Sequence, residues 1–219
     1  LLDDAAAEAV SAALRALGAT GKTGEVTRVP APASLPVRLV VAVGLGADDD
    51  ISADSLRQAA GTVMRSLEGT GPVASTLAAA GEDALAAVAE GFFLGGYRFD
   101  AFRSAKSTAS AKPLPGRVSL LVGQKTKELK AQLTEALIGA DAVALARDFV
   151  NTPPNELCPA EFAERARILG SKAGLDVEVL DEQALADGGY GGIVGVGQGS
   201  SRPPRLVRLS HSPAKAEKS

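Results

Sequence analysis

Val37–Val43 reads VRLVVAV, a nearly continuous run of β-branched and other apolar residues. A run in which polar residues do not alternate with apolar ones is typical of a strand buried on both faces of a sheet. VSLLV at Val118–Val122 has the same character. Because helical patterns lie between and around these two runs, the sequence predicts an α/β protein with a mostly parallel sheet.

Helical and strand patterns alternate along the rest of the chain. Ser52 and Asp181 are residue types that cap helix N-termini, and Pro159 suits the first position of a helix. Within the third helical pattern, Phe92 and Phe93 are expected to point into the core. Apolar spacing predicts helices over Asp3–Leu17, Asp54–Leu67, Glu82–Leu94, Lys125–Val150, Pro159–Gly174 and, in a short form, between Asp181 and Gly189. Further strands are predicted at Glu25–Val29, Val73–Thr76, Asp176–Leu180, Ile193–Val196 and Arg205–Leu209.

The longest helical pattern, Lys125–Val150, divides the chain into two parts. It cannot continue beyond Pro153, because proline lacks the N–H that a helix interior needs. One side of it is apolar, formed by Leu129, Leu133, Leu137, Ala140 and Ala144. We therefore predict an N-terminal domain over residues 1–124, a connecting helix over 125–150, and the beginning of a second domain over 151–219.

The composition is that of an ordinary globular protein, since 46% of the 219 residues are hydrophobic and 22% are charged. No apolar run approaches the roughly 20 residues of a membrane span, so we expect no membrane association. A single cysteine, Cys158, excludes an internal disulfide and suits a reducing, cytoplasmic compartment. Because the chain begins with Leu1 rather than Met, we expect it to be a portion of a longer protein.

The net charge of −3 argues against nucleic acid as a main partner. One segment, Ala101–Lys130, departs from this balance and contains a single acid, Glu128. We interpret it as a solvated face or an intersubunit belt. Its seven basic residues are Arg103, Lys106, Lys112, Arg117, Lys125, Lys127 and Lys130.

GATGKTG at Gly18–Gly24 contains the Gly-Lys-Thr that ends a phosphate-binding P-loop. A P-loop requires another glycine five positions before the glycine of that tripeptide, and here the position is Ala16. A P-loop also follows a strand and opens a helix, whereas this stretch follows a helix and leads into a strand. We therefore predict a helix stop and a turn.

A second glycine-rich stretch, Gly188–Pro204, offers Gly195, Gly197 and Gly199 as part of a dinucleotide fingerprint. The third glycine of that fingerprint would fall on Ser200, and prolines follow where a helix should begin. A strand with close backbone packing, followed by a loop, is the favoured interpretation.

Residues for hydrolytic chemistry are scarce. The only histidine is His211, in a polar tail, so the sequence offers neither an HExxH zinc site nor a Ser–His–Asp site. Ser212 and Lys215 form one SxxK pattern, which lacks a helix to align it. Cys158 precedes a helix and could have a lowered pKa, although without a neighbouring base it is better explained as a capping residue. The acidic run Asp48–Asp50 is interpreted as a solvated loop.

Four segments together resemble the leucyl aminopeptidases, also called cytosol aminopeptidases. ARDFVNTPPNELCPAEFAERA at Ala146–Ala166 is similar to the stretch with which the catalytic domain of that family begins. GGIVGVGQGSSRPPRLVRL at Gly191–Leu209 is similar to the segment that follows it. EGFFLGGYRFDAFRS at Glu90–Ser104 and GKTGEV at Gly21–Val26 resemble parts of its N-terminal domain. The resemblance therefore covers essentially the whole chain.

The resemblance implies a macro-like N-terminal α/β domain, a long connecting helix and the start of a catalytic α/β domain. It implies an enzyme that releases N-terminal residues, often leucine, from peptides with a free N-terminus. Two divalent cations, Mn²⁺ or Zn²⁺, would serve that reaction, because bridged metal ions activate water and polarise the scissile carbonyl. Family members typically form homohexamers.

The metal-binding motifs of the family, of the types GKGITFD and NTDAEGR, do not occur in these residues. We therefore expect the chain to end at Ser219 before them, to lack the family's first strand or strands before Leu1, and to be inactive alone. No residue here inherits a catalytic, cofactor-binding or metal-binding role, and we expect this portion to bind no cation. The alternative is a non-catalytic macro-like module for assembly or for ligand or DNA binding, which we would prefer if the natural gene stopped at Ser219.

Overall fold

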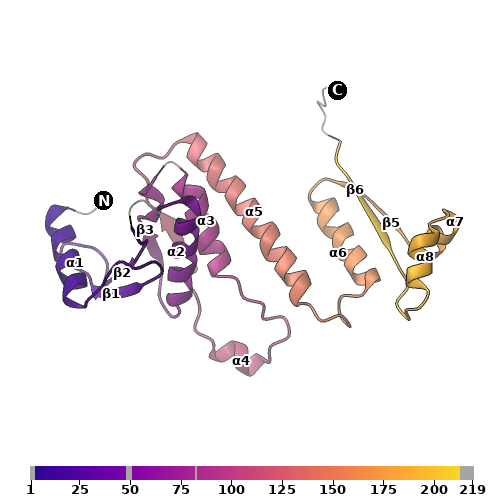
Figure 1. The fold of residues 1–219 in the computed structure, drawn as a ribbon, viewed down its shortest axis with the longest axis horizontal. Helices are drawn as coiled ribbons and strands as arrows, with labels where there is room; N and C mark the ends of the chain where they lie inside the picture. Colours follow the sequence, from indigo (N-terminus) through magenta and orange to yellow (C-terminus); the bar gives the residue numbers. More distant parts are fainter. Residues whose placement is uncertain (1–2, 48–50, 82, 213–219) are drawn as a thin grey trace. The chain divides into compact units, whose positions relative to one another are not determined.

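A computed structural model describes residues 3–47, 51–81 and 83–212 of the chain (Figure 1). The chain divides into two compact units, Leu1–Arg147 and Asp148–Ser219. The first unit contains α1 (Asp4–Ala16), β1 (Val26–Pro30), β2 (Leu39–Val43), α2 (Ala53–Ser66), β3 (Val73–Ser75), the 3₁₀ helix η2 (Leu77–Ala79), α3 (Ala84–Gly95), α4 (Ala105–Ser110), β4 (Val118–Leu120) and most of α5 (Lys127–Asn151). The second contains the end of α5, then α6 (Pro159–Lys172), β5 (Asp176–Leu180), α7 (Glu182–Asp187), α8 (Gly191–Gly197) and β6 (Leu206–Ser210).

Helices and short sheets alternate, which confirms the mixed α/β class, but the sheets are not those expected. Among the described residues, the strands form three separate pairs: β1–β2 and β5–β6 are antiparallel, and β3–β4 is parallel. The prediction of a mostly parallel sheet is therefore wrong. The connection between β1 and β2, residues 31–38, is shorter than the dozen or more residues that a parallel crossover needs.

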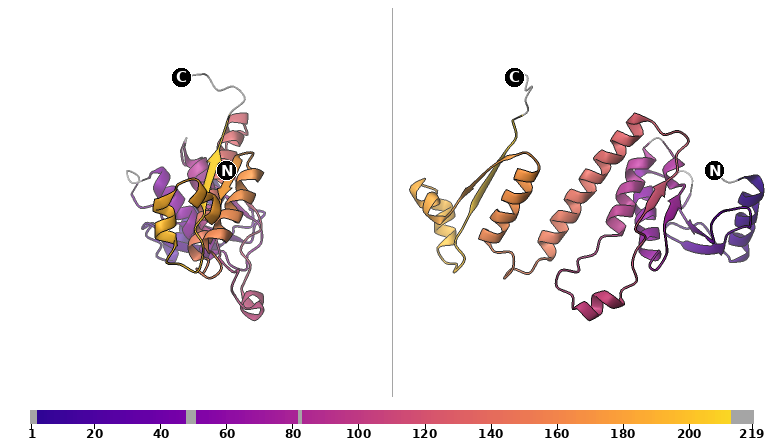
Figure 2. Two further views of the ribbon diagram at one scale, coloured as in Figure 1. Left: turned by 90° about the vertical axis from the view of Figure 1, so that its right-hand side faces the viewer. Right: turned by 180° about the vertical axis from the view of Figure 1, so that it is seen from behind.

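The core of the first unit lies on the helix pair α2–α3, whose members run side by side in Figures 1 and 2. Ala60 and Val88, one from each helix, are fully buried, and Phe92 is only 5% exposed. Phe93 is 38% exposed, so its predicted inward position is wrong. Side chains of successive helical residues point about 100° apart, and α3 turns Phe92 rather than Phe93 toward α2.

The VRLVVAV run forms β2, but it is not buried on both faces as predicted. All five residues of β2 are partly or largely exposed, and Leu39 is 42% exposed. Val41 and Val43 nevertheless pack against the buried cluster on α2 and α3. Within the described residues β2 pairs with β1 on one edge only.

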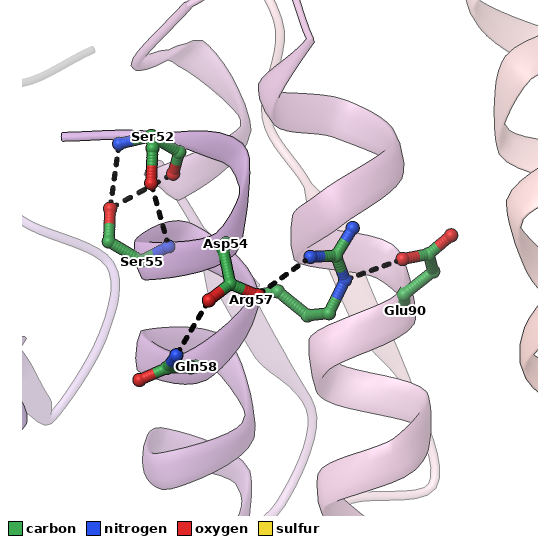
Figure 3. A network of polar contacts seen from close by, with 6 residues as sticks. All are labelled: Ser52, Asp54, Ser55, Arg57, Gln58 and Glu90. Carbon is green, nitrogen blue, oxygen red and sulfur yellow. Dashed lines mark hydrogen bonds and ion pairs between the residues drawn. The ribbon is translucent and has the colours of Figure 1, made fainter.

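The N-terminus of α2 is closed by a capping box, which confirms the prediction for Ser52 (Figure 3). The Ser55 N–H donates to Ser52 Oγ at 3.2 Å, and the Ser52 N–H donates to Ser55 Oγ at 2.8 Å. One turn further along, Arg57 reaches across to α3 and donates from Nε to Glu90 at 2.6 Å. A second guanidinium nitrogen of Arg57 contacts Asp54 at 3.1 Å, so this side chain links the first turn of α2 to α3.

Glycines allow α2 and α3 to approach each other closely. A Cβ atom added at Gly91 would lie 2.3 Å from the carbonyl oxygen of Arg57. One added at Gly95 would lie 2.6 Å from the Cα atom of Gly61. The backbones of the two helices are therefore in direct contact, and any side chain at these positions would push them apart.

In the second unit, the residues that begin the helices α6 and α7 were predicted correctly. Pro159 is the first residue of α6, and the Asp181 carboxylate caps α7 by accepting from the Ala184 N–H at 2.9 Å. The strand predicted at Ile193–Val196 is wrong, because these residues belong to the helix α8. The carbonyl of Tyr190 accepts from the N–H groups of Ile193 and Val194 and so begins that helix.

Candidate functional site

The GATGKTG stretch lies between α1 and β1, as predicted, and forms a turn. Gly18, Gly21 and Gly24 have φ angles of 73°, 76° and 77°, which lie in the left-handed region that glycine adopts without strain. Gly44 lies directly against this turn, because a Cβ added there would be 2.1 Å from the carbonyl oxygen of Lys22.

The donors of this turn are directed at a carboxylate of the protein itself. Thr20 donates to Glu25 twice, from its hydroxyl at 2.8 Å and from its backbone N–H at 2.9 Å. These bonds, the hydroxyl first, lower the pKa of Glu25, and the N–H groups of Gly21 and Lys22 add to the effect. An anion is thus already present where a phosphate would have to bind, and it is Glu25.

The glycine-rich stretch Gly188–Pro204 begins directly after α7 and covers the helix α8 and the loop that follows. Gly195 and Gly197 lie within α8 rather than between a strand and a helix, which is the place a dinucleotide fingerprint requires. The expected strand is absent, but the backbone is packed closely here, since a Cβ added at Gly197 would lie 2.6 Å from Cγ of the Pro204 ring.

Cys158 is the N-cap residue of α6 and is half-buried. Its side chain makes no capping hydrogen bond, yet the backbone N–H of Glu161 lowers the pKa of the thiol, and the guanidinium of Arg202 lowers it further. The lowered pKa that the sequence allowed is therefore present, whereas the preferred interpretation as a capping side chain lacks its hydrogen bond.

The remaining candidate groups do not converge on Cys158. His211 and Ser212 are exposed beyond β6. Lys215 and the run Asp48–Asp50 lie outside the described residues. Among the residues that the structure describes, no three His, Cys, Asp or Glu side chains are grouped closely enough to hold a metal ion. Nor is any described helix both long and apolar enough to cross a membrane.

The first unit contains an apolar cavity of about 610 Å³ between α3, β4 and α5. Phe92 and Phe93 line it from α3, and Leu129, Leu133 and Leu137 line it from α5. Three of the five residues on the predicted apolar side of the long helix therefore line this cavity, whereas Ala140 and Ala144 do not. The lining includes two lysines but no acidic, hydroxyl-bearing or histidine residue. It can accommodate apolar groups, but it offers no base or nucleophile for catalysis.

This cavity is not evident from the sequence, because its walls come from elements far apart in the chain. Two members of the basic segment line it: Lys130 in α5, and Lys125 just before that helix. The rest of that segment includes α4, which Figures 1 and 2 show within the long connection between α3 and β4. All residues from 101 to 112 are exposed, and Arg103 pairs there with Asp100 at 3.1 Å.

Two family models match the chain, in the order in which their domains follow one another. The N-terminal domain of the cytosol aminopeptidase family matches residues 1–106, and the catalytic domain of the same family matches residues 144–219. Among solved structures, the bottromycin maturation enzyme BotP in complex with Mn is 34% identical with a TM-score of 0.79, covering 92% of this chain and 42% of that one. A mutant tomato leucine aminopeptidase, 24% identical over 95% of this chain and 42% of that one, has the same fold with a TM-score of 0.79.

Curated relatives agree with these matches. A probable cytosol aminopeptidase of Rhodococcus jostii (strain RHA1) is 53% identical over 217 residues, or 98% of this chain. One of Nocardia farcinica (strain IFM 10152) is 55% identical over 97% of this chain. The chain spans 42% of the length of each of these two relatives. With both of its domain matches drawn from one family, the chain belongs to the cytosol aminopeptidase family, of which it contains the N-terminal domain and the first part of the catalytic domain.

Proposed function

We propose that this chain is part of a metal-dependent leucyl aminopeptidase that releases N-terminal residues, often leucine, from peptides. The observation that carries the proposal is the ordered pair of domain matches, at residues 1–106 and 144–219. The 53% identity to a probable cytosol aminopeptidase over nearly all of the chain supports it further.

The catalytic and metal-binding residues of that enzyme are proposed to lie outside residues 1–219. The described residues do not fit a divalent metal ion, because they bring no three His, Cys, Asp or Glu side chains together. We propose two divalent cations, Mn²⁺ or Zn²⁺, for the longer protein, and the similar structure of BotP in complex with Mn supports the first of these. This portion then contributes scaffold rather than chemistry.

The domain boundaries 1–124, 125–150 and 151–219 form part of the same proposal, with a macro-like N-terminal domain. The interval between the two family matches, residues 107–143, contains the start of α5, and the division between the compact units falls within that helix. We further propose a cytoplasmic homohexamer that acts on peptides with a free N-terminus and has no membrane or nucleic-acid partner.

Release of p-nitroaniline from leucine p-nitroanilide tests the function. The product of the longer gene is expected to hydrolyse this amide with Mn²⁺ or Zn²⁺ and to lose activity when the metal is chelated. Chain 1–219 under the same conditions is expected to be inactive. Hydrolysis by chain 1–219 would overturn the assignment of the active site to other residues, whereas an inactive longer protein, loaded with metal and folded, would overturn the function itself.

A further inference from the structure

The apolar cavity between α3, β4 and α5 is lined by side chains that the first unit leaves partly open to solvent. Phe93 of α3 and Leu137 of α5 are each 38% exposed, and Leu129 and Leu133 are half-buried. The volume of about 610 Å³ lies within the range of roughly 300–1,000 Å³ that small-molecule sites occupy. An apolar ligand that covered these side chains would remove their surface from water, which is favourable.

Charged and apolar side chains are separated along the wall that α5 provides. Lys125 directly precedes the helix and Lys130 lies near its start. Leu129, Leu133 and Leu137 follow at every fourth residue, which places them on one face of the helix. From the first to the last of these leucines the helix rises by about 12 Å, at roughly 1.5 Å per residue. The cavity thus has positive charge at one end and a long apolar wall beyond it.

The two ammonium groups at this end have no anionic partner in the described part of the chain. Neither Lys125 nor Lys130 forms an ion pair with a described carboxylate. The acid nearest to both in the sequence is Glu128, whose pKa is lowered by hydrogen bonds from its own backbone N–H and from the Thr126 side chain. The N-terminal end of a helix also carries partial positive charge, so α5 adds to the field of the lysines. An anion is therefore favoured at this end of the cavity.

The rest of the lining restricts what such an anion can carry. Apart from the two lysines, the lining residues are methionine, alanine, valine, leucine and phenylalanine. None of these side chains is a strong hydrogen-bond acceptor, so the N–H groups of a peptide or the hydroxyls of a sugar would be buried without partners, at a cost. A hydrocarbon chain has no such groups. A carboxylate has two oxygen atoms that can accept from the two ammonium groups.

We propose that this cavity binds straight-chain alkyl carboxylates. The carboxylate lies between Lys125 and Lys130, and the alkyl chain extends along Leu129, Leu133 and Leu137. This site is separate from peptide hydrolysis, since its lining offers neither a base nor a nucleophile. The ligand is bound and released without any covalent change.

Calorimetric titration of the longer gene product with decanoate, below the concentration at which decanoate forms micelles, tests the proposal. One decanoate is expected to bind per polypeptide. From hexanoate to decanoate the affinity is expected to rise about fourfold for each added methylene, because each one buries further apolar surface.

The carboxylate contact is tested by replacing both lysines. Lys125→Gln with Lys130→Gln is expected to weaken decanoate binding about tenfold and to leave the binding of decan-1-ol, which has no charge, within about twofold. Retained binding of the alcohol also shows that the variant is folded and its cavity intact. Lys127→Gln is the matched control, because Lys127 lies on the same helix between the two lysines but does not line the cavity. It should change neither affinity by more than about twofold.

Absence of decanoate binding by the folded longer protein would overturn the proposal, because another part of the polypeptide would then cover the cavity. An equal loss of decanoate affinity in the Lys127→Gln control would overturn it as well, since net charge alone would explain the effect. If the double variant does not fold, the salt dependence of the unaltered protein decides: decanoate affinity that does not fall as salt is added contradicts a contact with exposed lysines. Peptidase activity enters none of these measurements, so this test and the test of function can fail separately.

Discussion

At the scale of single residues, Cys158 shows how position alters chemistry. A cysteine that begins a helix experiences the unpaired N–H groups of the first turn, and here the N–H of Glu161 is the largest influence on the thiol. Arg202, from the loop before β6, adds a positive charge nearby. Both favour the thiolate, so its fraction at neutral pH exceeds that of an ordinary cysteine.

Alkylation of Cys158 by iodoacetamide is expected to rise with pH through a midpoint below that of an unperturbed cysteine. The pKa of the thiol is lowered in the folded protein, so the reactive thiolate appears at lower pH. Arg202→Gln should move the midpoint upward without restoring the ordinary value, because the Glu161 N–H remains. The mass shift of the protein over time at each pH gives the rates.

Arg208→Gln is the matched control for this experiment, since that guanidinium pairs with Glu178 at 2.8 Å. It should leave the midpoint of Cys158 alkylation in place. An equal effect of the two variants would show that overall charge, rather than the neighbourhood of Arg202, governs the thiol.

Residue-scale features were also the most predictable from sequence, because they depend on neighbours in the chain. The caps at Ser52 and Asp181 and the proline at the start of α6 follow from local rules and were all confirmed. The direction of Phe93 was not predictable in this way. Nearly every position of α3 is apolar, so the sequence does not show which residues face α2.

At the scale of elements, the contact between α2 and α3 depends on glycine more than on charge. The Arg57–Glu90 pair across the two helices is 36% and 27% exposed, so it is screened by solvent and contributes modestly. The close approach at Gly91 and Gly95, in contrast, leaves no room for a methyl group. Backbone proximity at these two positions therefore determines how α2 and α3 pack.

Gly91→Ala is expected to destabilise the first unit by about 1–3 kcal/mol, because the new methyl group would meet backbone that cannot move aside. Gly139→Ala on α5 is the matched control, since nothing lies within 4 Å of a Cβ added there. Alanine favours a helix over glycine, so this control should stabilise by about 0.5–1 kcal/mol. Urea denaturation followed by circular dichroism measures both, and a stabilising Gly91→Ala would show that the helices can separate without cost.

Helices and strands were predicted correctly where the apolar pattern was long, and one was predicted wrongly where the pattern was short. Strand Asp176–Leu180 and the helices α1, α2 and α6 appear as expected, within a residue or two at their ends. The pattern of the four residues Ile193–Val196 fits a strand and a helix equally well. They are helical because the N–H groups of Ile193 and Val194 donate to the carbonyl of Tyr190. Sheet direction was missed although the short connection between β1 and β2 already implied an antiparallel pair.

At the scale of the whole molecule, the structure gives a physical reason why neither glycine-rich motif is a nucleotide site. The Gly-Lys-Thr turn directs its donors at Glu25, and Gly197 packs against Pro204. Element order was enough to argue against both nucleotide motifs. The apolar cavity could not be foreseen, because it depends on how α3, β4 and α5 come together.

Chain 1–219 in isolation is expected to self-associate through the edge of β2 that faces away from β1, because no described strand pairs with that edge. Leu39→Lys places a charge on that edge and should lower the association, as edge lysines do in natural sheets. Leu17→Lys at the end of α1 is the matched control, because Leu17 is a comparably exposed leucine, at 62% against 42%, that lies on no strand. Light scattering over a range of concentrations compares them, and an equal improvement in both variants would point to net charge alone.

The same edge bears on how much of the protein a cell retains. Incomplete chains with exposed apolar strands are the species that chaperones hold and proteases remove. An apolar strand edge left unpaired at Leu39–Val43 would therefore reduce the abundance of the folded protein. The amount of folded protein would fall although no residue at any of the candidate sites had changed.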